Sequence, residues 1–352
     1  MIYFQNDYAE GAHETILSKL LETNEVQTPG YGTDEFTSRA KELIKQACAS
    51  PEADVHFLTG GTQTNTTVIS AMLRPHQGVI SADSGHIAVH EAGAIESTGH
   101  KIITLASDDG KLTHEQVDVA ITDHFNDPTH EHIVQPGLVY ISQPTELGTM
   151  YSKEELTQLK EVCDKHDVPL FIDGARLGYA LAAKESDLKL ADVAALCDVF
   201  YIGGTKVGAL FGEAVVITNE KWQKDFRSII KQRGAMLAKG RLLGIQFETL
   251  FTDNLYGRLS SHAIEMADKL KQTFLDIGIS FKYEPSTNQL FPIVSNQLIQ
   301  QLSSRFAFYQ WEKYDNEHTV CRFITSWATK EEQIQALKED LSAFAPTRAG
   351  RN

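Results

Sequence analysis

The spacing of hydrophobic residues switches repeatedly between two patterns over residues 35–220. Apolar residues three or four positions apart predict helices, and short apolar runs bounded by glycine or polar residues predict strands. We expect helices at residues 35–48, 62–73, 86–97, 113–125 and 152–166. We expect strands at residues 54–58, 78–82, 101–105, 137–142, 168–172, 198–202 and 213–217. This alternation predicts an α/β fold, with a mostly parallel central sheet and helices on both faces.

The pattern changes after residue 220. Residues 221–275 have helical spacing almost throughout, with breaks expected near Gly234 and Gly257. Further strands are expected at residues 279–283, 289–293, 306–310 and 320–325, and helices at residues 295–303 and 330–344. Because the chain exceeds one ordinary domain in length, we expect two units and a short tail. These are a large domain over residues 1–250, a small α+β domain over residues 251–346 and a disordered tail at residues 347–352.

The charge balance excludes several classes of partner. The chain carries 32 Lys and Arg against 47 Asp and Glu, a net charge of −15. Nucleic acids and anionic membrane surfaces need basic faces, so we expect neither as a partner. The four cysteines are far apart and form no CxxC pair, which is typical of reduced thiols in a cytoplasmic protein. No signal peptide pattern and no apolar run approaching 18 residues is present, so we expect neither secretion nor a membrane span.

Two polar residues follow neighbouring buried strands, where parallel sheets bind ligands. Asp173 ends the strand at residues 168–172, and Lys206 follows the strand at residues 198–202 through Gly203-Gly204-Thr205. Such a pair is what pyridoxal 5′-phosphate (PLP) chemistry requires. A lysine forms an imine with the cofactor aldehyde, and an aspartate keeps the pyridine nitrogen protonated. The ordinary alternative is a surface lysine in a turn, but the apolar residues around Lys206 argue against full exposure.

A glycine-rich segment, residues 60–65, lies between an expected strand and an expected helix. Its glycines let backbone N–H groups turn towards an anion, and the start of a helix adds a favourable dipole. This suits a cofactor phosphate, although a plain strand–helix turn with Thr62 as N-cap fits the same residues equally well. No Gly-Lys-Ser/Thr follows, so the segment is not a nucleotide-binding Walker loop.

His86 begins the next expected helix and faces the same crevice, where its ring could stack on a pyridine. His86, His90 and Glu91 also have helical spacing, which is compatible with a metal site. No second cluster supplies further ligands, so we expect no metal. Glu91 could instead orient His86 or contact the cofactor.

Two arginines could bind the carboxylate of an amino acid. Arg176 lies three residues after Asp173 and offers a forked donor, although an Asp173–Arg176 ion pair is the alternative. Arg322 lies among Cys, Phe and Ile in an expected strand, which favours inward placement over an edge-strand charge in water. Basic residues also gather over residues 231–241, as an anion contact across a subunit boundary or as a solvated helix end.

Together these segments resemble the threonine aldolase and β-eliminating lyase family, which are PLP enzymes of fold type I. The resemblance covers nearly the whole chain, and its motifs occur in the family's order. They are Asn6-Asp7, residues 31–34, residues 60–65, residues 86–93, Asp173-Gly174-Ala175-Arg176, Thr205-Lys206, and Arg322 with Thr325. The resemblance implies the aspartate aminotransferase fold, with active sites shared within a homodimer or homotetramer.

The same resemblance implies a role for each matching residue. The cofactor would be held by Gly61 and Thr62 at the phosphate, His86 on the ring, Asp173 at the pyridine nitrogen and Lys206 at the aldehyde. Arg176, Arg322 and Asn6 would bind the substrate carboxylate, and Lys239 would reach the cofactor phosphate of a neighbouring subunit.

Two positions depart from the pattern of many members. Glu146, in Thr145-Glu146-Leu147-Gly148, stands where some members have a histidine facing the substrate side chain. Asn6 stands where many have a serine. Both changes leave the stereochemical preference and the accepted side chain open.

The activity implied is that of a carbon–carbon lyase of amino acid metabolism, resembling low-specificity threonine aldolases. It would cleave threonine, allo-threonine or phenylserine-type substrates to glycine and an aldehyde. Glu146, His86 or a water would accept the proton of the β-hydroxyl. The alternatives are β-elimination on the same cofactor, a non-catalytic PLP-fold binding protein, or a phosphate-binding protein without PLP.

Overall fold

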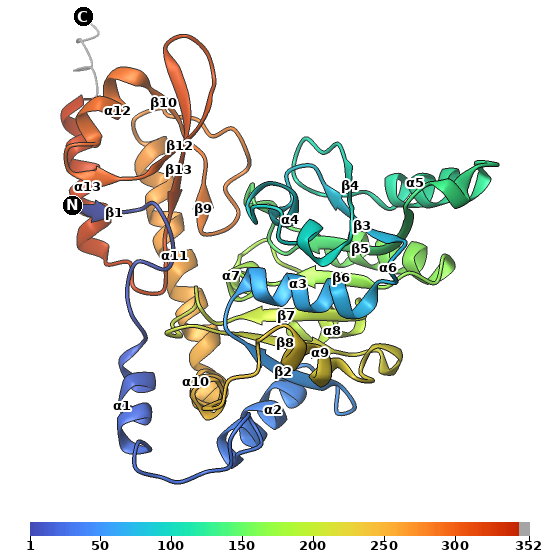
Figure 1. The fold of residues 1–352 in the computed structure, drawn as a ribbon. Helices are drawn as coiled ribbons and strands as arrows, with labels where there is room; N and C mark the ends of the chain where they lie inside the picture. Colours follow the sequence, from blue (N-terminus) through green and yellow to red (C-terminus); the bar gives the residue numbers. More distant parts are fainter. Residues whose placement is uncertain (345–352) are drawn as a thin grey trace, which may run out of the picture.

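The large sheet has seven strands and contains the strand ends singled out above. The computed structural model describes residues 1–344, so the tail expected at residues 347–352 lies outside it. The strand order is β2-β8-β7-β6-β5-β3-β4, and only β8 runs antiparallel to its neighbours (Figure 1). These strands are β2 (Asp54–Leu58), β3 (Gln77–Ala82), β4 (Ile102–Leu105), β5 (Gln135–Ser142), β6 (Leu170–Asp173), β7 (Val199–Gly203) and β8 (Glu213–Ile217). The expectation of a mostly parallel sheet is confirmed.

Alternate residues of each central strand pack into cores on opposite faces of the sheet. Tyr140 and Phe171 join one core, whereas Ile141 and Ile172 join the other. Because both faces are buried, these strands read as continuous hydrophobic runs, and polar side chains are left for the strand ends.

Helices cover both faces of this sheet (Figure 1). Those of the N-terminal part are α1 (Glu14–Glu22), α2 (Glu35–Ala47), α3 (Gly61–Met72), α4 (His86–Val89), α5 (His114–Asn126) and α6 (Lys153–Lys165). They are followed by α7 (Leu177–Ala182), α8 (Leu190–Ala195), α9 (Phe226–Gln232) and α10 (Arg241–Phe251). Single 3₁₀ turns lie at Glu96–Thr98, His130–His132, Glu220–Trp222 and Thr252–Asn254.

Two helix boundaries differ from expectation. The helix expected over residues 86–97 ends after Val89, since Ala92 and Gly93 adopt left-handed backbone angles (φ 50° and 74°) that stop helical hydrogen bonding. The long helical stretch breaks at Asp253 and Asn254, which are also left-handed, rather than near Gly257. Gly257 lies inside a helix, where a Cβ would come within 2.5 Å of Asn254 Oδ1.

The C-terminal part forms a smaller antiparallel sheet, in which β13 pairs with β10, β12 and β9. Its elements are α11 (Leu255–Leu275), β9 (Gln289–Leu290), β10 (Ile293–Ser295), α12 (Asn296–Leu302), β11 (Phe306–Ala307), β12 (Tyr309–Lys313), β13 (His318–Ile324) and α13 (Glu331–Phe344). The expected strand at residues 279–283 is reduced to a single bridge between Phe281 and Pro292.

The N-terminal strand belongs to this smaller part of the structure. Figure 1 shows β1 (Ile2–Tyr3) beside the C-terminal elements. β1 pairs in parallel with β11, and Phe4 packs among Phe306 and Phe323. The first residues, expected within the large domain, therefore contact the C-terminal sheet instead. This separate pairing also divides the strand expected at residues 306–310 into β11 and β12. The domain boundary near residue 250 stays a prediction.

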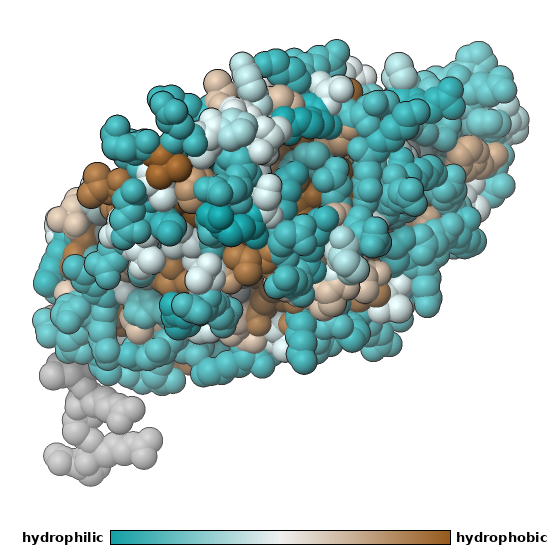
Figure 2. Space-filling view, turned by 90° about the horizontal axis from the view of Figure 1, so that it is seen from below, coloured by the Kyte–Doolittle hydropathy of each residue, from teal (hydrophilic) through white to brown (hydrophobic). Residues whose placement is uncertain are grey.

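Hydrophilic residues cover most of the face seen in Figure 2, and hydrophobic residues form separate patches on it. Among residues 1–344, no helix combines the length and apolar character needed to cross a membrane. The four cysteines are buried and unpaired.

Candidate active site

A cavity of about 560 Å³ opens at the carboxyl ends of β5, β6 and β7, between the two sheets. It brings together most of the residues singled out from the sequence. Those lining it are Gly61, Thr62, His86, Glu146, Asp173, Arg176, Lys206 and Arg322. Asn6 and Lys239 are not part of its lining.

Asp173 ends β6 with its carboxylate buried. Tyr140 donates a hydrogen bond of 2.6 Å to Oδ2, and Tyr201 donates one of 2.5 Å to Oδ1. Asn65 and the backbone N–H of Ala175 donate two more. Burial favours the neutral acid, but His86 and these donors outweigh it and hold the pKa of Asp173 below its usual value. The carboxylate is therefore ionised at neutral pH and faces the cavity.

A hydrogen-bonded chain leads from Asp173 to His86. The amide nitrogen of Asn65 donates to Asp173 Oδ2 at 3.1 Å and to Glu91 Oε1 at 2.7 Å. Glu91 Oε1 lies 2.8 Å from His86 Nδ1, which fixes the orientation of the imidazole. From the sequence, Glu91 could either orient His86 or contact the cofactor. The structure shows the contact with His86.

Glu146 follows the end of β5 and contacts the start of α4. Its Oε1 accepts a 2.7 Å hydrogen bond from the Ser142 hydroxyl and a 3.0 Å hydrogen bond from the backbone N–H of His86. Burial raises the pKa of Glu146, and the negative charge of Asp173 raises it further. The raised pKa means that Glu146 takes up a proton more readily than an ordinary glutamate.

Lys206 lies in the turn between β7 and β8. The Tyr179 hydroxyl donates to its carbonyl oxygen, and Thr205 donates to Glu213 beside it. Burial lowers the pKa of Lys206 and Arg176 lowers it further, whereas Asp7, Asp173 and Glu213 oppose this. The net lowering favours the neutral amine, which is the nucleophilic form.

Arg176 does not pair with Asp173, which was the alternative considered from the sequence. It makes a forked ion pair with Asp7, with distances of 2.7 Å from Nε to Oδ2 and 3.1 Å from Nη2 to Oδ1. Asn288 also donates to Asp7 Oδ2, at 3.0 Å. Asp7 is a residue of the site whose role the sequence did not reveal, because its partners lie 169 and 281 positions away.

Asn6, the neighbour of Asp7, is not brought to the cavity. Its side-chain oxygen instead accepts a hydrogen bond from the backbone N–H of Tyr8 at 3.0 Å. Tyr8 is the residue of this segment that lines the cavity.

Arg322 faces inward, as its apolar neighbours predicted. Its guanidinium carbon lies 4.9 Å from the ring centre of Trp311 and 5.4 Å from that of Tyr309. Nε is buried and has no hydrogen-bond partner among residues 1–344. Burial and the nearby Arg176 lower the pKa of Arg322 to about 10, which leaves it cationic at neutral pH. A buried cation with an unused donor is suited to a ligand carboxylate.

Glu213 is a second residue of the site that the sequence did not reveal. It begins β8, and its two oxygens accept hydrogen bonds from the Thr205 hydroxyl (3.0 Å) and the Gly204 N–H (3.1 Å). It therefore holds the two residues that precede Lys206. Burial raises the pKa of Glu213 to about 8, against the opposing charge of Lys206. The available signal was a glutamate at the start of an otherwise apolar strand.

Lys239 lies in a different cavity. Its walls come from the segment after α1 and from the start of α10, and they include Val26, Pro29 and Leu242. Within one chain, Lys239 therefore does not complete the site.

Comparison with known proteins places this geometry in a family. Residues 12–297 match the sequence model of the β-eliminating lyases. The chain belongs to the β-eliminating lyase family. It is also similar to a solved threonine aldolase from Leishmania major, with 44% identity, a TM-score of 0.95 and coverage of 98% of this chain and 100% of that one.

Curated relatives and more distant folds agree with this membership. The chain is 29% identical to the low specificity L-threonine aldolase of Pseudomonas aeruginosa, over 96% of each chain. An aspartate aminotransferase of Thermus thermophilus shares the fold at 15% identity, with a TM-score of 0.71 and coverage of 98% and 91%. The expectation of fold type I is confirmed.

Members of the family are PLP-dependent, and the cavity of this member fits that cofactor. The ionised Asp173 makes no ion pair with Lys or Arg among residues 1–344, so it can balance a protonated pyridine. The buried amide oxygen of Asn65 also has no hydrogen-bond partner in that range. At Gly61 a Cβ would lie 3.2 Å from the Tyr201 hydroxyl. Glycine at this position therefore leaves space between the backbone of α3 and Tyr201. Residues 1–344 contain no group of three or more His, Cys, Asp or Glu arranged to hold a metal.

Glu213→Gln is expected to reduce the loss of stability as the pH rises. The folded protein keeps a proton on Glu213 up to about pH 8, whereas the unfolded chain releases it near the ordinary pKa of 4.5. The unfolded state thus binds fewer protons in that window, so this group alone lowers the free energy of unfolding by about 1.4 kcal/mol per pH unit.

Urea unfolding of both proteins at about pH 5 and pH 8 measures the effect. Glu220→Gln, at an exposed glutamate, is the matched control. Equal pH slopes for the wild type and Glu213→Gln would show that Glu213 has an ordinary pKa.

Proposed function

We propose that this protein cleaves a β-hydroxy-α-amino acid by a retro-aldol reaction, giving glycine and an aldehyde. The observation that carries the proposal is the joint placement of Asp173, Lys206 and two arginines around one cavity. Relatives that cover nearly the whole chain are named low specificity L-threonine aldolases, which supports this choice of reaction.

The residues divide into a cofactor set and a substrate set. Lys206 would bind the cofactor through its amine, Asp173 would hold a proton at the pyridine nitrogen, and His86 would lie against the ring. Gly61 and Thr62, at the N-terminus of α3, would bind the phosphate. When bound, PLP supplies an electron sink for the charge left at Cα when the Cα–Cβ bond breaks.

Arg176 and Arg322 would hold the substrate carboxylate. Asp7 fixes the orientation of Arg176, whereas Tyr309 and Trp311 fix Arg322 by stacking. Holding the carboxylate at two points aligns the Cα–Cβ bond for cleavage.

Glu146 is a better candidate than His86 for accepting the proton of the β-hydroxyl. Its raised pKa makes it a stronger base than an ordinary glutamate, and two donors orient its carboxylate. His86 contributes its backbone N–H to this orientation, while its ring is held by Glu91 for contact with the cofactor.

β-Elimination is the second candidate, because the same residues would serve it. It differs in the bond that breaks at Cβ, and it yields an oxo acid and ammonia instead of glycine and an aldehyde. The names of the relatives favour the aldol reaction.

Lys206→Ala is expected to abolish both covalent cofactor binding and turnover. Wild-type protein treated with PLP and borohydride should carry a phosphopyridoxyl group on the peptide containing Lys206. It should also release glycine and acetaldehyde from threonine. The variant should show neither, because no other lysine among residues 1–344 lines the cavity.

Peptide mass mapping and product analysis measure the two effects, with the exposed Lys224→Ala as control. Labelling at another lysine would refute the role of Lys206. Formation of oxo acid and ammonia without glycine would refute the aldol reaction.

We also propose that two copies of the chain share their active sites, in a homodimer or a homotetramer. Lys239 lies outside the cavity of its own chain, although it is the expected phosphate contact. Figure 1 shows α1 on the outer side of α10, away from the sheet. Leu17, Leu21 and Val26 are exposed in α1 and the segment after it, and Val26 also lines the cavity of Lys239. Such apolar exposure is typical of a covered surface. The buried free cysteines support a cytoplasmic location for this assembly.

Mixed oligomers test the sharing of sites. One subunit carries Lys206→Ala and the other Lys239→Ala, with different affinity tags for purification of the hybrid. If Lys239 serves the neighbouring site, each hybrid dimer contains one intact site and should regain about half of the wild-type activity. If Lys239 acts within its own chain, no site in the hybrid is intact and activity should stay at the level of the parent variants.

A further inference from the structure

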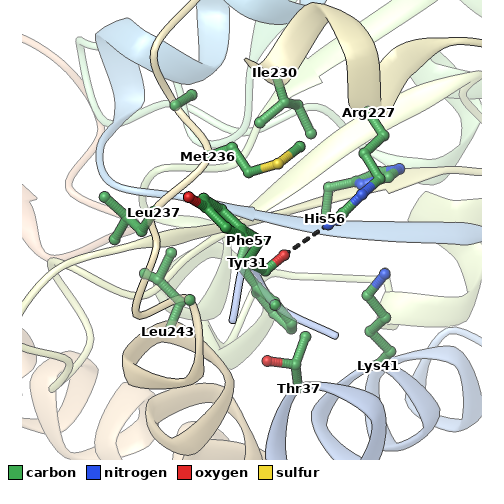
Figure 3. Close-up of a pocket in the computed structure, with 13 residues that line it drawn as sticks. Tyr31, Thr37, Lys41, His56, Phe57, Arg227, Ile230, Met236, Leu237 and Leu243 are labelled. Carbon is green, nitrogen blue, oxygen red and sulfur yellow. Dashed lines mark hydrogen bonds between the residues drawn. The ribbon is translucent and has the colours of Figure 1, made fainter. Parts of the chain in front are cut away.

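A second cavity lies between α2, β2, α9 and the segment that leads to Lys239 (Figure 3). It has a volume of about 40 Å³, which is room for a small ion or a few waters. It shares no lining residue with the candidate active site. Neither the proposed reaction nor cofactor binding uses it.

One side of this cavity is lined by basic side chains and the other by apolar side chains. Figure 3 shows the basic side chains of Lys41, His56 and Arg227 together on one side. They come from α2, β2 and α9, three elements that are distant in the chain. Met236 and Leu237 lie on the opposite side and are apolar.

The basic side has more donors than the protein satisfies. Arg227 donates to the carbonyl oxygen of Tyr31 at 2.7 Å, and His56 Nε2 lies 2.8 Å from Asp54 Oδ2. Among residues 1–344, neither Lys41 nor Arg227 has a carboxylate within 4.0 Å. Asp54 is an acidic neighbour of these three side chains, and it contacts His56 rather than Lys41.

The excess of positive charge over negative charge in this pocket affects the pKa of Lys41. Burial lowers its pKa, and the charges of Arg227 and Lys45 lower it further, while Asp54 opposes them. A partly buried ammonium beside a guanidinium is costly without a counter-ion. An anion in the cavity would remove this repulsion and accept the unused hydrogen bonds.

We propose that this pocket binds a small oxyanion of the phosphate or sulfate type between Lys41 and Arg227, beside His56. The small volume favours a free inorganic ion over a phosphorylated metabolite. A bound oxyanion would link α2 and α9 through charge-assisted hydrogen bonds. It would thereby stabilise the adjoining segment, residues 235–240, which contains Lys239.

Phosphate binding to PLP-saturated protein tests the proposal. The bound cofactor is reduced onto the protein with borohydride, so that free phosphate cannot enter the active site. Isothermal titration in a phosphate-free and sulfate-free buffer should then show saturable binding of inorganic phosphate. Phosphate should also raise the Tm, whereas sodium chloride at equal ionic strength should raise it less.

Lys41→Met and Arg227→Met remove the charges but keep the apolar part of each side chain. Each should weaken phosphate binding by about 10-fold to 100-fold, as expected for the loss of one charge-assisted hydrogen bond. Lys224→Met, at an exposed lysine, should bind phosphate like the wild type. The PLP content of each variant shows whether it has folded. If a variant does not fold, crystals of the wild type soaked in sulfate show directly whether an anion occupies the pocket.

Three results would overturn the proposal. They are the absence of saturable binding at millimolar phosphate, equal affinity in the wild type and both charge variants, and soaked crystals without an anion between Lys41 and Arg227. The proposed aldolase activity is measured separately, so its failure would be distinguishable from the failure of this site.

Discussion

The candidate active site depends on one buried carboxylate that stays ionised without an ion pair to Lys or Arg among residues 1–344. Asp173 is held by the hydroxyls of Tyr140 and Tyr201, from the two strands beside its own. The register of β5, β6 and β7 brings these three residues together, since Ser142 pairs with Asp173 and Phe171 with Val199. Neutral donors keep the negative charge available for a cationic ring, whereas a neighbouring lysine or arginine would neutralise it.

The ionised Asp173 also acts on the pKa values of the other titratable groups around the cavity. Two buried carboxyl groups, Glu146 and Glu213, have raised pKa values, partly because Asp173 is already negative. Burial and Arg176 lower the pKa of Lys206 against the charge of Asp173, so the amine proposed to bind the cofactor tends towards its neutral form. Environments that separate the pKa values of neighbouring groups are what assign acid, base and nucleophile to different residues.

Sequence patterns revealed what depends on neighbours in the chain. Asp173 and Lys206 were singled out because each follows a buried strand, and the structure places both at strand ends around one cavity. The pairing of Arg176 with Asp7 and of β1 with β11 depends on contacts between distant segments, which no local pattern records. The early end of α4 depends on the backbone angles at Ala92 and Gly93. Lys239 lies outside the cavity of its own chain, so a single chain cannot show the contact expected of it.

The most direct test of this account is the protonation state of the bound cofactor. PLP labelled with ¹⁵N at the pyridine nitrogen can be loaded into the protein and followed by NMR across neutral pH. The account predicts a protonated nitrogen in the wild type and an unprotonated one in Asp173→Asn. An unprotonated nitrogen in the wild type, or an unchanged signal in the variant, would contradict the central role of Asp173.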